Sequence, residues 1–201
     1  MSKILKNLFV LLSLMLMSQT LLANEEEDLK KHFYIKLENI KQVIKNNSHN
    51  KEKIQDEIIG ILTPIFDFEL MAKLSLGKNQ WKKMSQEDRK LFISLYTQRM
   101  KNSYSSKLDS YDDEVIKINS VEKRKNRIVL KSTIDTDDKV LKVVYKFYKP
   151  KNKKQNKDNW LIYDVEIIGI SILKTDKAQF KDFLQTKNIA ELMNTLASKN
   201  L

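Results

Sequence analysis

Cysteine is absent from the 201 residues of this chain. Its absence excludes structural disulfides, thiol nucleophiles, thiolate metal sites and lipid attachment at an N-terminal cysteine. Glycine and proline are also scarce, with three and two copies. Because these residues mark turns and loops, their scarcity predicts a body made mostly of regular secondary structure.

Residues that commonly bind metals or act as general bases are few. The two histidines, His32 and His49, have no second ligand at a useful spacing. The chain has neither an HExxH pattern nor a glycine-rich phosphate loop, and Gly169-Ile170-Ser171 lacks the second glycine of a nucleophile elbow. We therefore expect no metal site and no cofactor.

Two pairs of carboxylates keep an enzyme open as an alternative. Asp67 and Glu69 stand near a predicted helix start, and Asp164 and Glu166 alternate along a predicted strand. Such pairs serve as acid and base in glycosidases. However, acids at a helix start complement the helix dipole, and strand acids commonly mark a solvated face or pair with lysine. We favour these structural roles.

The N-terminus has the order of a secretory signal peptide. Lys3 and Lys6 precede an almost unbroken apolar run, Leu8 to Met17, and Ala23 stands before an acidic segment. This order predicts a signal peptide over residues 1–23 that is removed on export. A permanent transmembrane helix is the alternative, but the run is short for a hydrocarbon core of about 30 Å.

Residues 24–201 are expected to form one domain, since no linker divides them and their length suits a single core. The chain has 37 basic and 26 acidic residues, a formal charge of +11 that falls to +9 without Lys3 and Lys6. Such a surface attracts anionic membranes or polyanions. The lysine-rich run 149–157 has no aromatic residue for base stacking, so we interpret it as a solvated hairpin loop and expect no nucleic-acid partner.

Apolar spacings of three and four predict helices in the first half of the chain and in its tail. Helices are expected over 25–46 and 51–62, from Pro64 to Gly77, from an N-cap at Ser85, and within 175–199. In the helix after Ser85 an aromatic and apolar stripe recurs at intervals of four: Phe92, Tyr96, Met100, Tyr104 and Leu108. By itself, such a stripe is compatible with either plain core or a ligand pocket.

Alternation with period two predicts four strands, at 115–118, 128–134, 141–147 and 160–168. The connections between them are short enough for antiparallel neighbours. Helices followed by consecutive strands and then helices indicate an α+β fold.

Two blocks of residues carry a resemblance to a known family. The first contains Phe66-Asp67-Phe68, Met71-Ala72, Leu76-Gly77, Trp81, Phe92, Tyr104 and Leu108; the second contains Trp160, Tyr163-Asp164-Val165, Gly169-Ile170-Ser171 and Phe180. In order and spacing they resemble the MlaC or Ttg2D family of periplasmic phospholipid-binding proteins. The chain departs from the family in having fewer arginines around 70–73 and 174–178.

The resemblance implies a curved antiparallel sheet of about four strands, surrounded by several helices, that encloses an apolar cavity for phospholipid tails. It also implies a non-catalytic, monomeric periplasmic carrier. Such a carrier moves phospholipid between an outer-membrane lipoprotein complex and an inner-membrane ABC transporter complex and so maintains outer-membrane lipid asymmetry.

Carried onto this chain, the resemblance gives two lipid-contacting walls. One contains Phe66, Met71, Leu74, Phe92, Tyr96 and Met100; the other contains Leu141, Val143, Tyr145, Phe147, Leu161, Tyr163, Val165 and Ile167. Two alternatives stay open. The chain could be a protein-interaction module with a solid core and a basic surface, or an enzyme that uses Asp67 or Asp164.

Overall fold

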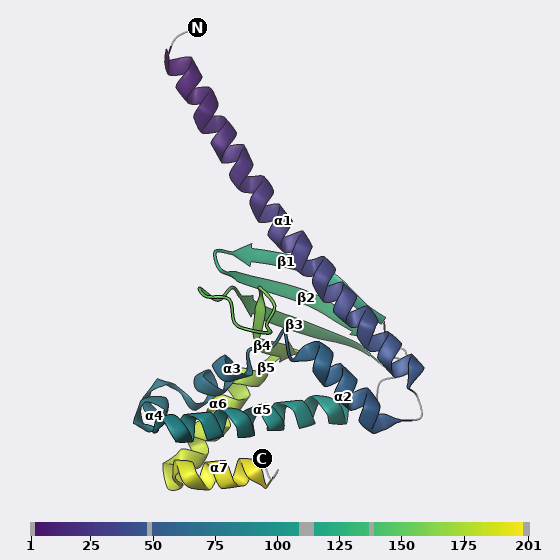
Figure 1. The fold of residues 1–201 in the computed structure, drawn as a ribbon, viewed down its shortest axis with the longest axis vertical. Helices are drawn as coiled ribbons and strands as arrows, with labels where there is room; N and C mark the ends of the chain where they lie inside the picture. The colour runs from purple at the N-terminus through teal and green to yellow at the C-terminus, as the bar shows by residue number, and fades with distance from the viewer. Residues whose placement is uncertain (1–2, 48–49, 109–114, 137–138, 199–201) are drawn as a thin grey trace.

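The computed structural model describes the chain except residues 1–2, 48–49, 109–114, 137–138 and 199–201; for residues 3–24, 51, 104–108 and 115 only the backbone is described. The elements in order are α1 (Lys3–Asn46), α2 (Lys51–Leu62), α3 (Phe68–Leu76), α4 (Lys78–Lys83), α5 (Gln86–Leu108), β1 (Val115–Arg124), β2 (Arg127–Asp135), β3 (Val140–Tyr148), β4 (Leu161–Ile167), β5 (Ile170–Ser171), α6 (Ile172–Thr186) and α7 (Ile189–Ala197). This order confirms the predicted α+β class (Figure 1).

The strands form one curved, open antiparallel sheet in chain order, β1 to β5. The predicted four strands are all present, and the two-residue β5 is additional. Leu130 lies opposite Tyr145, which lies opposite Val165, so these apolar side chains share one face. The other face carries charged residues such as Lys131 and Lys146. The alternating strands therefore give the sheet one apolar side.

Two groups of helices pack against the sheet. α1 crosses the sheet, and α3, α5, α6 and α7 gather at the far end of the body (Figure 1). Phe92 and Tyr96 of α5 pack edge-on against Phe180 of α6, at 5.9 and 6.3 Å between ring centroids. The apolar stripe predicted after Ser85 thus joins helix to helix in the residues that the structure describes.

The third helix starts later than predicted. Pro64 lies in a turn, and Asp67 is the N-cap of α3, with its side chain accepting from the Leu70 amide at 3.1 Å. The segment between them pairs with β4 instead: the Ile162 amide donates to Ile65 at 2.8 Å, and the Asp67 amide donates to Ile162 at 2.9 Å. This extended pairing competes with a helix start at Pro64, so that prediction was wrong.

Capping residues set several other boundaries. Gly77, at φ 81°, ends α3 as predicted, and Ser85 accepts from the Asp88 amide at 3.0 Å as the cap of α5. The short α4 between them was not predicted. The tail is divided into two helices because Asn188 and Glu191 form a capping box at the start of α7.

Candidate functional site

The side of the sheet beneath α1 is lined by apolar residues from β1 to β4. We define the apolar sheet face as the large apolar side chains on this side: Ile116, Ile118, Val121, Ile128, Leu130, Ile134, Leu141, Val143, Tyr145, Phe147, Ile162, Val165 and Ile167. Six of the eight residues predicted for the sheet wall belong to this face: Leu141, Val143, Tyr145 and Phe147 of β3, and Val165 and Ile167 of β4.

Burial divides the apolar sheet face in two. Six of its residues are at most 3% exposed: Ile128, Leu130, Val143, Phe147, Ile162 and Val165. The other seven are only partly buried: Ile116, Ile118, Val121, Ile134, Leu141, Tyr145 and Ile167. This second group presents apolar surface that the rest of the protein does not fully cover.

Helix α1 packs directly on the apolar sheet face. The ring of Phe33 lies edge-on to Tyr145 and Phe147, at 4.7 and 5.9 Å between centroids. Burial raises the pKa of Tyr145 to about 12, so its phenol is neutral at physiological pH. Phe33 recurs with Leu29 and Leu37 at spacings of four within the helix predicted over 25–46, but this spacing does not show which element the three residues cover. Phe33 was therefore missed as a site residue.

Two carboxylates fasten α1 to the end of the sheet where β1 and β3 finish. Glu25 pairs with Lys123 of β1 at 2.6 Å and with Lys149, just after β3, at 2.7 Å. Glu26 accepts from the Lys123 amide at 2.5 Å. Hydrogen bonds from Lys123 and then Lys149 lower the pKa of Glu25. α1 is thus held by ion pairs at this end and by apolar contacts along the sheet.

The other predicted wall lies inside the protein, with one exception. Phe66, Met71, Phe92, Tyr96 and Met100 are at most 3% exposed, whereas Leu74 is 38% exposed. The buried residues of α3 recur at spacings of three and four, which places Leu74 on the opposite side of that helix. Its assignment to an interior wall was wrong.

A polar contact lies within the same helical layer. The Tyr96 hydroxyl donates to Asp176 at 2.7 Å, and Arg99 donates to the other oxygen of Asp176 at 2.9 Å. Asp176 is only 2% exposed, so this pairing satisfies a carboxylate buried between α5 and α6.

Leu161 and Tyr163 do not lie on the apolar sheet face. Lys146 is opposite Asp164 while Phe147 is opposite Ile162, so Tyr163 is an extra residue in β4. Its ring lies 6.0 Å from that of Tyr148, on the other side of the sheet, and Leu161 is opposite Tyr148. A bulge of one residue moves side chains to the opposite face, so strict alternation misplaced these two. Ile162, which was not predicted, takes the position on the apolar side.

The lysine-rich loop after β3 folds back onto α3. Lys154 pairs with Asp67 at 2.9 Å and with Glu69 at 3.2 Å. Lys157 donates to two main-chain carbonyls of the α2–α3 turn, at 2.5 and 2.8 Å. The interpretation of a solvated loop was therefore wrong for these two lysines. Asp67, one of the candidate catalytic acids, has a structural role in this contact.

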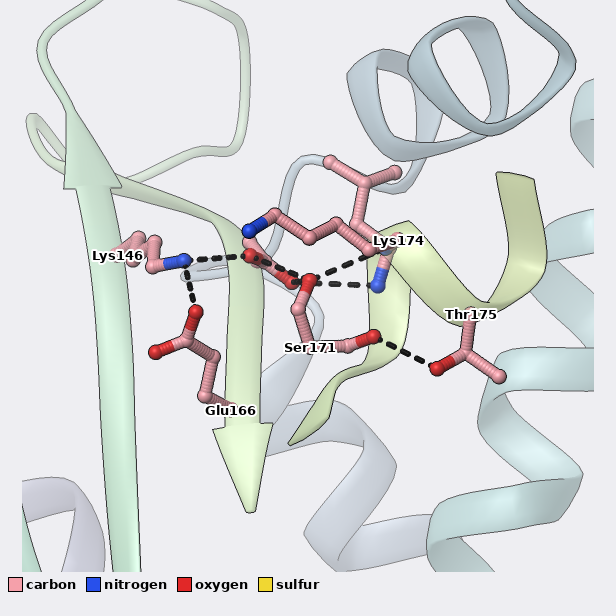
Figure 2. A network of polar contacts seen from close by, with 7 residues as sticks. Lys146, Glu166, Ser171, Lys174 and Thr175 are labelled. Atoms are coloured by element: carbon pink, nitrogen blue, oxygen red, sulfur yellow. Dashed lines mark hydrogen bonds and ion pairs between the residues drawn. The ribbon is translucent and has the colours of Figure 1, made fainter. Parts of the chain in front are cut away.

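Asp164, the other candidate acid, joins β4 to α6 through Ser171, which Figure 2 shows beside Lys174 and Thr175 at the start of α6. It accepts from the Ser171 hydroxyl at 2.9 Å and from the Leu173 amide at 3.2 Å, and it pairs with Lys146 at 3.0 Å. Lys146 also pairs with Glu166 at 2.5 Å. Burial disfavours the charge of Lys146, but hydrogen bonds to Glu166 and Asp164 outweigh burial and raise its pKa. Lysine pairing was predicted for these acids; a solvated position was not borne out for Asp164, which is 3% exposed.

A hollow of about 440 Å³ opens between α1 and the lysine-rich loop. Its floor is made by Leu29, Ile65 and Trp160, each at most 7% exposed. Its rim is polar: Glu25, Asp28, His32, Lys149, Lys153, Lys157, Asp158 and Asn159. None of the predicted lipid-contacting residues lines this hollow. No local pattern in the sequence indicated that α1 and the lysine-rich loop would meet here.

Two further observations concern the described residues only. Within them, no cluster of three or more His, Asp or Glu side chains could hold a metal ion. No helix in that part of the chain is both long and apolar enough to cross a membrane.

Comparison with known proteins supports the resemblance noted above. The family described as MlaC protein matches residues 36–198. A solved structure of the phospholipid-binding protein from Ralstonia solanacearum, in complex with a phospholipid, aligns with a TM-score of 0.71 at 18% identity. The alignment covers 87% of this chain and 96% of that one, and it shows a shared fold. A search of curated proteins found no significant match.

Proposed function

This chain belongs to the MlaC protein family, and from that premise we propose that it is a phospholipid carrier of the periplasm. The similar protein from Ralstonia solanacearum was solved with a phospholipid bound, and it shares this fold over nearly its whole length. A carrier of lipid needs an apolar surface for acyl chains more than it needs a catalytic group.

One observation in this structure carries the proposal: part of the apolar sheet face is only partly covered by the rest of the protein. Ile134, Leu141 and Ile167 belong to one continuous apolar side of the sheet but are only partly buried. Adjoining residues are better covered: Val143 is 3% exposed, and Tyr145 and Phe147 contact Phe33 of α1. Acyl chains that lie on this face and separate it from α1 would exchange water for aliphatic and aromatic contacts.

A carrier is needed because the free-energy cost of exposing acyl chains to water is large. Exposing a methylene to water costs about 0.8 kcal/mol, so two tails with roughly 30 methylenes would cost on the order of 24 kcal/mol to move unshielded through an aqueous space. A protein surface as apolar as the bilayer makes the transfer nearly neutral. The direction of net transport is then set by the partners that load and unload the carrier.

The proposal also covers how the protein is exported and between which membranes it carries phospholipid. The protein would be exported by its signal peptide, residues 1–23, and act as a monomer between an outer-membrane lipoprotein complex and an inner-membrane ABC transporter complex. By returning phospholipid it would maintain the lipid asymmetry of the outer membrane. The basic surface of the chain, with its formal charge of +11, favours encounters with anionic membranes at either end.

Native mass spectrometry of the protein purified from periplasm, together with uptake from phospholipid vesicles, tests the proposal. We expect bound phospholipid in the wild type. Leu141→Asp, on the apolar sheet face, should lower retention, while its neighbour Val140→Asp, on the opposite and 59% exposed side, should not. A folded wild type with neither bound lipid nor uptake would reject the carrier and favour the protein-interaction module.

A further inference from the structure

We propose that the hollow between α1 and the lysine-rich loop binds the headgroup of a zwitterionic phospholipid, in which a phosphate is joined to an amine. This inference rests on the proposed function and adds to it a site and a lipid class. The hollow has the two components that such a ligand needs, an apolar floor and a rim that carries both signs of charge.

The floor of the hollow is continuous with the core. Leu29, Ile65 and Trp160 belong to the same buried cluster as Phe33 and Phe147, which meet under α1. A lipid whose headgroup lies on the rim would therefore place its tails along the contact between α1 and the apolar sheet face once α1 separates from the sheet.

Lysines of the loop supply the positive side of the rim. Lys149 is held by Glu25 and lies 5.8 Å from the centre of the Trp160 ring. Lys157 uses two of its three N–H donors on main-chain carbonyls, which leaves one donor. Lys153 makes no hydrogen bond or ion pair with any residue that the structure describes, and it is exposed on the rim. Lys153 is thus the cation best able to meet a phosphate.

The negative side of the rim also has one uncommitted group. Glu25 pairs with two lysines, and Asp158 pairs with Lys36 at 3.2 Å. The Asp28 carboxylate forms no hydrogen bond or ion pair within the described part of the chain; only its main-chain carbonyl contacts a side chain, that of His32, at 3.0 Å. Asp28 can therefore accept from a ligand amine.

The balance of charge selects the ligand class. The rim contributes three lysines and three carboxylates, so a ligand with net negative charge meets repulsion as well as attraction. A phosphate joined to an amine satisfies both Lys153 and Asp28. A headgroup with glycerol in place of the amine leaves the carboxylate without a cationic partner.

The experiment is competitive loading of the full mature protein from vesicles of equal phosphatidylethanolamine and phosphatidylglycerol, followed by mass spectrometry of the bound lipid. We expect the wild type to prefer phosphatidylethanolamine by about fivefold, the factor that corresponds to an exposed ion pair near 1 kcal/mol. Asp28→Asn should bring the ratio close to one with total lipid unchanged. Lys153→Gln should weaken binding of both lipids.

Matched variants control for net charge. Glu27→Gln changes the charge of the adjacent position on α1, and Lys151→Gln does so in the same loop; neither residue lines the hollow. Both should retain the wild-type ratio and affinity. Thermal unfolding shows whether each variant is folded. If Asp28→Asn does not fold, Lys153→Gln still tests the proposal, because Lys153 is exposed.

The outcomes separate the two proposals. No lipid bound by the wild type rejects the carrier itself. Lipid bound with the same ratio and affinity in Asp28→Asn, Lys153→Gln and the controls rejects the headgroup site and leaves the carrier standing. Glycerophosphoethanolamine, which has the headgroup without tails, should not compete at equal concentration; effective competition would assign the hollow to a soluble phosphate ester and overturn the lipid proposal.

Discussion

Asp164 is a charged residue that is almost fully buried, and its neighbours explain how the fold tolerates it. Its two oxygens are occupied by Lys146, the Ser171 hydroxyl and the Leu173 amide. Ser171 in turn caps α6 by accepting from the Lys174 amide at 3.0 Å (Figure 2). A single carboxylate thus fixes the start of α6 against β4.

Replacing Asp164 should therefore cost stability. We expect Asp164→Ala to lower the free energy of unfolding by about 3 kcal/mol, because it breaks a buried network and leaves Lys146 poorly paired. Glu166→Ala should cost less than about 1 kcal/mol, since Glu166 is more exposed and, among the residues that the structure describes, its carboxylate pairs with Lys146 alone. Urea denaturation followed by circular dichroism measures both. Equal costs would contradict the assigned role.

Ile168 has a conformation that is rare for a branched residue. Its φ is 51°, in the left-handed region, and its side chain is 62% exposed in the turn between β4 and β5. Asparagine tolerates this region better, so Ile168→Asn should raise the free energy of unfolding by about 1 kcal/mol. Ile170→Asn is the control, since Ile170 is 65% exposed but has no positive φ. Equal effects of the two variants in urea denaturation would rule out backbone strain.

At the scale of elements, the attachment of α1 depends on a carboxylate whose pKa is lowered. The interactions of Glu25 with Lys123 and Lys149 favour its charged form, so their contribution to stability is complete above the ordinary pKa of 4.5. As the pH falls through the lowered pKa of the folded state, Glu25 takes up a proton and that contribution is lost.

This predicts a pH-dependent difference between the wild type and Glu25→Gln. At pH 7 the variant should have the lower melting temperature, and the gap should close as the pH falls toward 3. Amide hydrogen exchange in α1 should follow the same trend, with faster exchange at pH 7 in the variant. A gap that stays constant from pH 7 to 3 would mean that Glu25 does not act through its charge.

The sequence predicted elements better than it predicted faces. The bounds of α2, the cap at Ser85 and the order of the four long strands follow from local patterns, because periodicity and capping are properties of neighbouring residues. The sides of β4 could not be obtained this way, since the bulge at Tyr163 depends on pairing with β3. The same limit applies to Phe33 and Lys153, whose partners or neighbours lie far away in the chain. Contacts between distant segments determine which side chains come together in the site. Local patterns in a single sequence do not reveal these contacts.

At the scale of the whole molecule, the sheet and the helical layer form one packed unit, and α1 is a separate element that lies on it. The sheet and the helical layer share buried aromatic contacts and charged networks such as that of Asp164. α1 lies across the sheet as one long helix (Figure 1), and its Phe33 contacts Tyr145 and Phe147 of β3. If acyl chains occupy the apolar sheet face, α1 is the element that must move to admit them.

Spin labels can measure this movement directly, because the chain has no cysteine that would compete for labelling. One pair is placed at Ile35, exposed on α1, and at Lys142, exposed on the charged face of β3. Loading with phospholipid should lengthen this distance by about 4 Å, the contact separation of one added carbon layer. A control pair at Lys142 and Lys181 of α6 should not change. If lipid binds while both distances stay constant, the tails lie elsewhere, and the contact between α1 and the sheet is core rather than binding site.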